Sequence, residues 1–98
     1  MRILITGAAG MIGRKLTERL VADGGLNGRR IAELLLHDIV EPQAPDLPGA
    51  KVTTMTGDLA DDGAAERLVA FRPDVVFHLA GIVSGEAEAD FEKGYRVN

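Results

Sequence analysis

The chain has 98 residues, about two-thirds of a typical domain of roughly 150 residues, so it holds one domain at most. Hydrophobic residues make up 46% and charged residues 27%, as in ordinary globular proteins, which excludes a disordered or fibrous chain. The net charge is -4 and no dense basic stripe is present, which excludes nucleic acid as the main partner.

The sequence also argues against a metal site, secretion and membrane insertion. Cysteine is absent, and His37 and His78 each lack a second histidine at ligand spacing, so we predict no bound metal. An uninterrupted run of only three apolar residues precedes the first glycine turn, whereas a signal peptide has a run of roughly 7–15. No apolar run approaches the roughly 18 residues of a membrane-spanning helix. We therefore predict a soluble, cytoplasmic protein that does not bind membranes.

The first half of the chain predicts two buried strands and one helix. The apolar run Arg2–Thr6 shows no alternation, which is typical of a strand buried on both faces of a parallel sheet. From Met11 onwards, apolar residues recur every four positions, which predicts an amphipathic helix that ends at Asp23-Gly24-Gly25. We then expect a polar loop over residues 26–30, one helical turn over residues 31–33 and a second buried strand over residues 34–38.

The second half continues the alternation of strands and helices. Three prolines followed by glycine predict an irregular loop over residues 41–50. β-Branched residues predict a third strand over Lys51–Thr56. Asp61 or Asp62 is expected to cap a helix that runs to about Ala70. We further expect a fourth strand over residues 75–79 and the opening of another helix over residues 85–98. This order predicts an α/β fold with a doubly wound parallel sheet.

A glycine-rich turn, Thr6-Gly7-Ala8-Ala9-Gly10-Met11-Ile12-Gly13, joins the first strand to the first helix. Gly7 permits the tight turn, Gly10 lets the backbone approach a pyrophosphate, and Gly13 lets the helix pack closely on the sheet. The phosphates would meet the N-terminus of the helix, where free N–H groups favour anions. A P-loop needs glycine where Ile12 stands, so the turn predicts dinucleotide binding rather than phosphoryl transfer. The structural alternative is a turn that merely connects strand and helix.

Asp38 ends the second predicted strand 25 residues after Gly13, where the dinucleotide fingerprint has an acidic residue after about 20. The glycine-rich residues 24–28 would account for the additional residues between Gly13 and Asp38. The Asp38 carboxylate can accept hydrogen bonds from both ribose hydroxyls and would repel a 2′-phosphate, which favours NAD over NADP. Arg14 can still reach toward a 2′-phosphate, so NADP stays an alternative. The structural alternative for Asp38 is a solvated turn residue.

Three more polar residues lie at or near the predicted strand ends. Asp58 is predicted at the edge of the same dinucleotide site, where its carboxylate can accept a hydrogen bond from an adenine amine. Its alternative role is to cap a turn. His37 and His78 lie inside apolar strands, so we predict hydrogen-bonded packing roles for them rather than acid–base catalysis.

With the glycine turn, Asp38, Gly57-Asp58-Leu59 and His78-Leu79-Ala80-Gly81 in this order, the whole chain resembles the extended short-chain dehydrogenase/reductase family. This family includes the NAD-dependent epimerases and dehydratases of nucleotide sugars. The run from Val83 to Phe91 is similar to a narrower subgroup, the D-erythronate dehydrogenase-like members that oxidise sugar acids. The resemblance implies a Rossmann sheet truncated after about four strands. Residues 1–98 would form the N-terminal part of the NAD(P)-binding domain, with the remaining strands and the substrate lobe absent.

The resemblance also implies a set of contacts. The backbone around Ala9 to Ile12 would cradle the pyrophosphate, Asp38 would bind the adenosine ribose, and Asp58 with Leu59 would flank the adenine. Leu79 to Gly81 would line the path to the nicotinamide ribose, and Asn98 would have a structural and cofactor-side role. The predicted cofactor-binding residues are therefore Gly7, Ala9, Gly10, Met11, Ile12, Gly13, Asp38, Asp58, Leu59, Leu79, Ala80, Gly81 and Asn98, with Ser84 beside the substrate.

The chain departs from the family at the catalytic pair, Tyr-x-x-x-Lys, in which the tyrosine is the acid–base group. The only tyrosine is Tyr95, its partner position would be residue 99, and it lies in the wrong predicted helix. The resemblance thus implies a catalytic pair further along the parent protein, no catalytic residue among residues 1–98, and a chain that is inactive by itself. It also implies that the parent is a homodimer.

Three hypotheses about function stay open. In the first, the chain is the N-terminal NAD-binding portion of an NAD-dependent oxidoreductase of sugars or sugar acids, or of a nucleotide-sugar epimerase, which is an isomerase. In the second, the same fold is a non-catalytic NAD(P)-sensing module. In the third, it is a scaffold that has lost cofactor binding.

Overall fold

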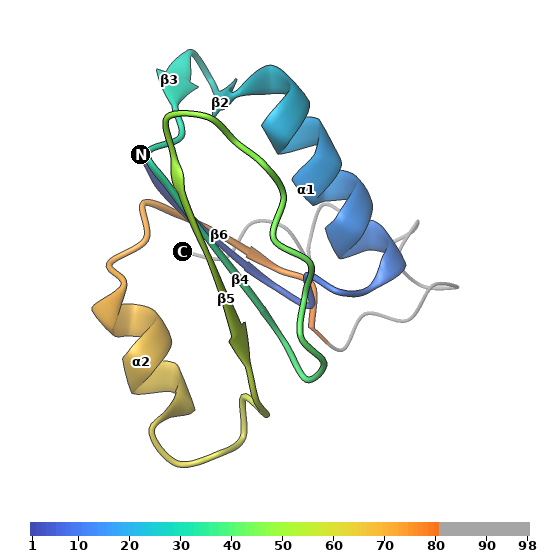
Figure 1. The fold of residues 1–98 in the computed structure, drawn as a ribbon. Helices are drawn as coiled ribbons and strands as arrows, with labels where there is room; N and C mark the ends of the chain where they lie inside the picture. The colour runs from blue at the N-terminus through green and yellow to red at the C-terminus, as the bar shows by residue number, and fades with distance from the viewer. Residues whose placement is uncertain (81–98) are drawn as a thin grey trace.

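The computed structural model describes residues 1–80, so the helix predicted over residues 85–98 lies outside the described residues. The described residues form a parallel four-stranded sheet in the order β5-β4-β1-β6 and a separate two-stranded hairpin, β2-β3 (Figure 1). The strands of the main sheet are β1 (Arg2–Thr6), β4 (Glu33–Asp38), β5 (Lys51–Thr56) and β6 (Val75–His78). This arrangement confirms the predicted α/β fold with a parallel sheet, and it matches the four predicted strands closely.

The central strands are buried on both faces, as their uniformly apolar sequences predict. Ile3, Ile5 and Leu34 have no exposed surface, and Leu36 is almost fully buried. The chain first moves outward from β1 to β4 and β5, and it then returns to β6 on the opposite side of β1. The direction of the strand order therefore changes between β1 and β6, and in open α/β sheets ligands bind at the carboxyl ends of the strands beside such a change.

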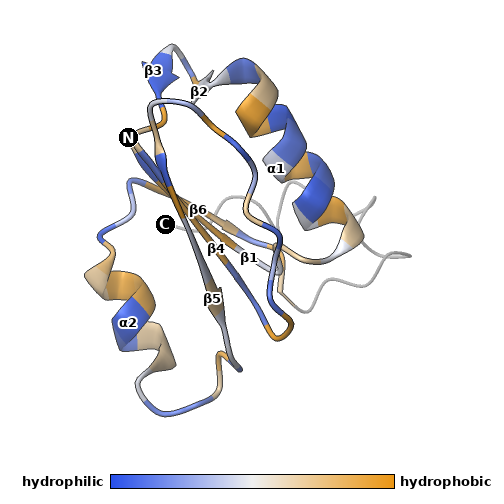
Figure 2. Ribbon diagram, in the orientation of Figure 1, coloured by the Kyte–Doolittle hydropathy of each residue, from blue (hydrophilic) through white to orange (hydrophobic). Residues whose placement is uncertain are grey.

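Helix α1 (Met11–Asp23) covers one face of the sheet. Leu20 is buried, and Ile12 and Leu16 pack against the core that the sheet residues Ile3 and Ile5 form. The hydropathy colours alternate along α1 but are uniformly apolar in the middle of β4, as an amphipathic helix on a buried strand requires (Figure 2). The helix ends at Gly24, which has a φ of 68° and donates its N–H to the Leu20 carbonyl.

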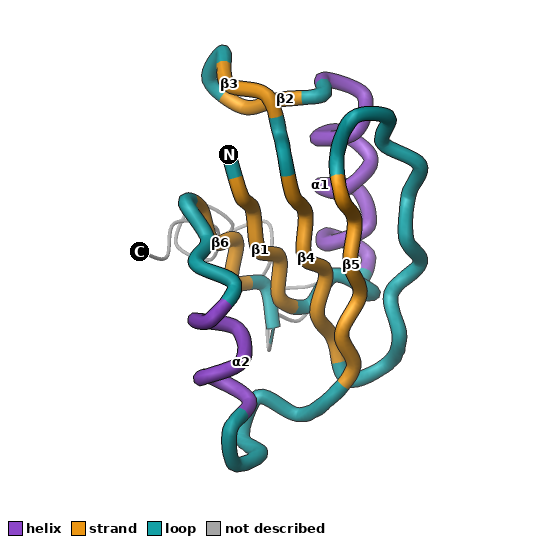
Figure 3. Tube along the Cα trace, turned by 60° about the vertical axis from the view of Figure 1, so that its left-hand side comes forward, coloured by secondary structure: helices purple, strands orange, loops and turns teal. Residues whose placement is uncertain are grey.

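Helix α2 (Ala64–Ala70) lies on the other face, so the sheet is sandwiched between α1 and α2 (Figure 3). Its Leu68 forms a second buried cluster with Leu4 and Leu35 of the sheet. The prediction that Asp61 or Asp62 caps this helix was wrong. The cap position is Gly63, which has a φ of 81° and makes no side-chain capping bond. The aspartates instead lie in the turn before the helix, where the Asp61 N–H donates to the Asp58 carbonyl.

The polar loop predicted over residues 26–30 is a hairpin of β2 (Gly25–Leu26) and β3 (Arg29–Arg30). Asn27 and Gly28 form its turn with φ values of 52° and 78°. Positive φ at both central positions is the conformation that a two-residue hairpin turn prefers, and Asn-Gly is its commonest sequence. The hairpin supplies the additional residues between the glycine turn and Asp38, at the position where the sequence predicted them.

Two smaller predictions also need correction. Residues 31–33 do not form a helical turn, because the Ala32 N–H donates to the Met1 carbonyl at 2.8 Å and β4 already begins at Glu33. The fourth strand ends at His78 rather than at Leu79, although the Leu79 N–H still bonds to the Thr6 carbonyl at 3.0 Å. The loop predicted over residues 41–50 contains no helix or strand, as expected.

Candidate functional site

The glycine turn connects β1 to α1. Its conformation requires glycine at two positions, Gly7 and Gly13. Gly7 has a φ of +75°, and a Cβ atom there would lie 2.7 Å from the backbone nitrogen of Ala80. A side chain at this position would therefore be strained and would also collide with the segment that follows β6. The prediction of a tight turn at Gly7 is confirmed.

Gly13 brings the first turn of α1 against the glycine turn itself. A Cβ atom at Gly13 would overlap the carbonyl oxygen of Gly7 and lie 2.7 Å from the Cα of Ala8. Both obstacles are backbone atoms, which cannot move aside as a flexible side chain can. The close packing predicted for Gly13 is therefore present, but its partner is the turn before the helix rather than the sheet.

Gly10 lies at the cap of α1 and is the glycine that leaves space open. Among residues 1–80 and apart from its chain neighbours, a Cβ atom there would have only the Gly7 carbonyl oxygen within 4 Å, at an ordinary 3.5 Å. The first bond of the helix runs from the Arg14 N–H to the Gly10 carbonyl at 2.9 Å. Among residues 1–80, the N–H groups of Met11, Ile12 and Gly13 have no hydrogen-bond acceptor. The helix thus presents free donors beside an open backbone, which fits the phosphates of a dinucleotide.

Asp38 brings the end of β4 into contact with this turn. Its Oδ2 accepts a hydrogen bond from the Ala9 N–H at 2.8 Å, and its Oδ1 accepts one from the Ile39 N–H at 2.6 Å. The Ala8 N–H also donates to the His37 carbonyl at 3.1 Å. Two adjacent residues of the turn are therefore tied to β4. Asp38 is held in place at the carboxyl end of the sheet rather than solvated freely.

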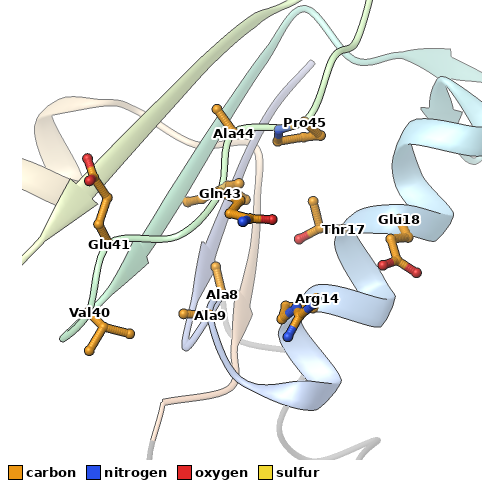
Figure 4. A pocket seen from close by; sticks show the side chains of 11 residues that line it. Ala8, Ala9, Arg14, Thr17, Glu18, Val40, Glu41, Gln43, Ala44 and Pro45 are labelled. Atoms are coloured by element: carbon orange, nitrogen blue, oxygen red, sulfur yellow. The ribbon is translucent and has the colours of Figure 1, made fainter.

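A cavity of about 390 Å³ lies beside this contact, between α1 and the loop that follows β4 (Figure 4). The glycine turn, three polar residues of α1 and the start of the loop form its walls. Its lining residues are Ala8, Ala9, Arg14, Thr17, Glu18, Leu36, Val40, Glu41, Gln43, Ala44 and Pro45. The amphipathic pattern of α1 placed Arg14 and Glu18 on its polar face, and the sequence predicted that only Arg14 can reach toward the cofactor. No sequence signal indicated that residues 40–45 form the opposite wall.

Asp58 and Leu59 follow β5 at the same edge of the sheet. The Asp58 side chain is occupied locally, because its Oδ1 accepts a hydrogen bond from the Ala60 N–H at 2.9 Å. This is the turn-capping role that the sequence offered as the alternative to an adenine contact. Leu59 packs against the second core cluster, on the face that α2 covers.

Thr6 lies between the two histidines at the carboxyl edge of the sheet. It pairs with His37 of β4 on one side and with His78 of β6 on the other. Its hydroxyl oxygen lies 2.6 Å from Nδ1 of His78, which confirms the hydrogen-bonded packing role of that histidine. His37 is also buried, but its Nδ1 has no hydrogen-bond partner within residues 1–80, so the predicted hydrogen bond is not made by that nitrogen.

We expect His37 to make the protein less stable at mildly acidic pH. Burial lowers the pKa of His37 below its ordinary 6.5, with Asp38 raising it and Arg67 lowering it further. The unfolded chain therefore takes up a proton first as the pH falls below about 6.5, and the free energy of unfolding decreases there. Thermal unfolding of His37→Leu across this range should show a weaker decrease than the wild type. An unchanged pH dependence would contradict this role.

Some predicted site residues are not placed by the structure. Gly81, Ser84 and Asn98 lie outside the described residues, whereas Leu79 and Ala80 follow β6 directly, with Leu79 buried. Within residues 1–80, no group of His, Asp and Glu side chains is arranged to hold a metal ion. No helix in that part of the chain is long and apolar enough to span a membrane.

Comparison with known proteins agrees with this geometry. Residues 3–96 match the NAD dependent epimerase/dehydratase family. The chain is 45% identical to D-erythronate dehydrogenase of Cupriavidus necator, over all of its own length and 31% of that protein. Among solved structures, a nucleoside-diphosphate-sugar epimerase from Agrobacterium tumefaciens superposes with a TM-score of 0.80 and 56% identity, over 99% of this chain and 28% of that one.

A second solved structure shows a cofactor in this fold. Uronate dehydrogenase from Agrobacterium tumefaciens, a variant complexed with NAD, has a TM-score of 0.62 and 36% identity over 84% of this chain and 27% of that one. The present chain thus spans about a third of the length of the curated relatives it matches. The match over residues 3–96, together with the glycine turn held to Asp38 at the carboxyl edge of a parallel sheet, shows that the chain belongs to the NAD-dependent epimerase/dehydratase family.

Proposed function

We propose that this chain is the NAD-binding N-terminal portion of an oxidoreductase that acts on a sugar or a sugar acid. The observation that carries this proposal is the hydrogen bond from the Ala9 N–H to Asp38, because it holds the glycine turn, which would bind the phosphates, against the carboxylate that would bind the ribose. Bound NAD supplies the hydride acceptor for such chemistry. The residues of this chain bind and orient the cofactor.

In this proposal the cofactor follows the carboxyl edge of the sheet. The free N–H groups of Met11 to Gly13 would hold the pyrophosphate, and the open backbone at Gly10 would let it approach. Asp38 would accept hydrogen bonds from the adenosine ribose, which favours NAD over NADP. Asp58 with Leu59 would flank the adenine. Leu79, Ala80 and Gly81 would line the path to the nicotinamide, with Asn98 on the cofactor side and Ser84 beside the substrate.

Sugar acids are the favoured substrate class, because D-erythronate dehydrogenase of Cupriavidus necator and uronate dehydrogenase of Agrobacterium tumefaciens are 45% and 36% identical to this chain over the parts that align. Nucleotide-sugar epimerisation is the second candidate, favoured by the likeness to the Agrobacterium epimerase. The two activities differ in their redox balance. A dehydrogenase releases NADH into solution with each turnover, whereas an epimerase returns the hydride to its substrate and accumulates none.

The test is to incubate the complete gene product with NAD and with aldonic acids, uronic acids or UDP-sugars in turn. We expect NADH to accumulate with one class of sugar acid. Conversion of a UDP-sugar to its epimer without NADH would replace this assignment by the second candidate. NADH binding without turnover, in a gene product that lacks Tyr-x-x-x-Lys after residue 98, would favour the NAD(P)-sensing module.

Three further expectations belong to the same proposal. Residues 1–98 by themselves would form only part of the NAD(P)-binding domain and would not catalyse, because Tyr95 has no lysine at the required spacing within the chain. The complete protein would be a homodimer, an expectation that rests on the family resemblance. A cytoplasmic location is supported by the absence of cysteine.

A further inference from the structure

His37 is a buried ionisable residue at the edge of the proposed cofactor site, and the proposed function does not use its side chain. The residue is 4% exposed. Within residues 1–80, its Nδ1 is the one buried side-chain nitrogen or oxygen that has no hydrogen-bond partner. Buried polar atoms are nearly always hydrogen-bonded, so an unpaired ring nitrogen at this position calls for an explanation.

The backbone of His37 connects β4 to the glycine turn. Its carbonyl accepts a hydrogen bond from the Ala8 N–H at 3.1 Å, and the carboxylate of the next residue, Asp38, accepts one from the Ala9 N–H at 2.8 Å. These two bonds hold the glycine turn, which would bind the phosphates, against the carboxylate that would bind the ribose. A displacement of His37 would therefore disturb both parts of the proposed site.

The strands beside His37 supply no charged partner for its ring. His37 lies on the face of the sheet that α2 covers, because it follows Leu35 by two residues and Leu35 packs against Leu68 of α2. Its neighbours in register are Thr6 of β1 and Met55 of β5. Neither side chain titrates, so the strands on both sides suit a neutral imidazole.

Three ionisable groups lie around His37, and none of them is placed to pair with a protonated ring. Arg67 of α2 is a cation and opposes protonation. Asp38 favours it, but successive strand residues point to opposite faces, and the Asp38 oxygens already accept two backbone N–H groups. His78 lies beyond Thr6 and shares its Nδ1 with the Thr6 hydroxyl. Protonation would thus leave His37 as a buried cation without an ion pair.

We propose that His37 is a positioning residue whose neutral ring keeps the end of β4 in the cofactor-binding conformation, so that mild acid releases the cofactor. The inference rests on the proposed function. A protonated ring gains hydration by turning toward water, and this movement would loosen the bonds from Ala8 and Ala9. Coupling between two binding events is reciprocal, so bound cofactor would in turn oppose protonation of His37.

The direction of the pH dependence follows from burial. Burial lowers the pKa of His37 below its ordinary 6.5, so the ring is neutral and the affinity is greatest above that pH. The affinity decreases as the pH falls through the pKa of His37 in the free protein, because only the neutral fraction binds. One pH unit below that pKa, about a tenth of the protein is neutral, and the dissociation constant for NAD should be about tenfold higher.

The test measures the dissociation constant of the complete gene product for NAD by calorimetry between pH 8 and pH 5. We expect the wild type to lose affinity with falling pH as described. His37→Leu should bind as the wild type does at pH 8 and should keep that affinity at pH 5. His37→Gln, which keeps a polar side chain that does not titrate, serves the same purpose if leucine impairs folding. Circular dichroism at each pH checks that the proteins are folded.

A second measurement reports on the ring itself. The imidazole signal of His37, identified by its absence from the NMR spectrum of His37→Leu, should titrate with a lower pKa when NAD is bound. His78→Gln is the matched control, because it removes the other histidine at this edge and should retain the decrease in affinity with falling pH.

The outcomes separate this inference from the proposed function. NAD may bind at pH 8 with an equal pH dependence in the wild type and His37→Leu, or with the same pKa of His37 in the free and bound protein. Either result overturns the inference and leaves the proposed function standing. If NAD does not bind the wild type at pH 8, both are overturned.

Discussion

Replacement of Gly13 by alanine is expected to destabilise the protein and to abolish tight NADH binding. The new methyl group would overlap the Gly7 carbonyl oxygen and press on the Ala8 Cα, so the first turn of α1 would have to separate from the glycine turn. Overpacking of this kind costs roughly 1–3 kcal/mol, and more where backbone atoms form the obstacle. Denaturant unfolding of the complete gene product would measure the loss, and an NADH titration would measure the binding.

Gly10→Ala is the matched control within the same turn. Its methyl group would lie at an ordinary 3.5 Å from the Gly7 carbonyl oxygen, and its φ of -75° suits alanine. We expect less than about 1 kcal/mol of destabilisation, the size of a weak N-cap effect. Its NADH affinity should nevertheless fall, because the methyl group would occupy space through which the pyrophosphate approaches. Wild-type stability of Gly13→Ala, or wild-type affinity of Gly10→Ala, would contradict the assigned roles of the two glycines.

Asp38→Ala is expected to weaken NADH binding by about tenfold to a hundredfold, the effect of losing a hydrogen bond to a charged group. The substitution would remove two interactions of the Asp38 carboxylate at once. It would leave the proposed ribose hydroxyls without their acceptor, and it would release the Ala9 N–H that Asp38 Oδ2 accepts at 2.8 Å. The dissociation constant would be measured by calorimetry on the complete gene product.

Two variants separate these contributions. Asp38→Asn keeps an oxygen acceptor for Ala9 but loses the negative charge, so its affinity should lie between those of the wild type and Asp38→Ala. Asp46→Ala removes an exposed aspartate from the loop after β4 that makes no hydrogen bond or ion pair with residues 1–80, and it should bind NADH as the wild type does. Equal affinities for Asp38→Ala and Asp46→Ala would remove Asp38 from the cofactor site.

The strands and α1 could be predicted from sequence because their signals are local. The apolar run Arg2–Thr6 has the pattern of a strand buried on both faces, and the four-residue recurrence from Ile12 to Leu20 has the period of a helix. The hairpin was missed because β2 and β3 have two residues each, which is too short for any alternation. Asn27-Gly28 was the available signal, since both residues adopt the positive φ of a hairpin turn.

The sequence could predict only those parts of the site that depend on the type of residue at a given position. Asp38 and the glycines were identifiable because the fingerprint depends on backbone freedom and on one carboxylate at a strand end. The bond from Ala9 to Asp38 and the cavity around Arg14 depend on how α1 and the loop after β4 lie against the sheet, which sequence spacing does not encode. The orphan Nδ1 of His37 likewise depends on three-dimensional packing, since His78 lies in an equally apolar strand and has a partner.

A titration of the complete gene product with NADH, followed by nicotinamide fluorescence, tests the central claim most directly. We expect saturable binding of one NADH per chain. We also expect a gain of about 2.7 kcal/mol in the free energy of unfolding at a hundred times the dissociation constant. An absence of binding at millimolar NADH, with an unchanged melting temperature, would contradict the claim that this chain holds the cofactor.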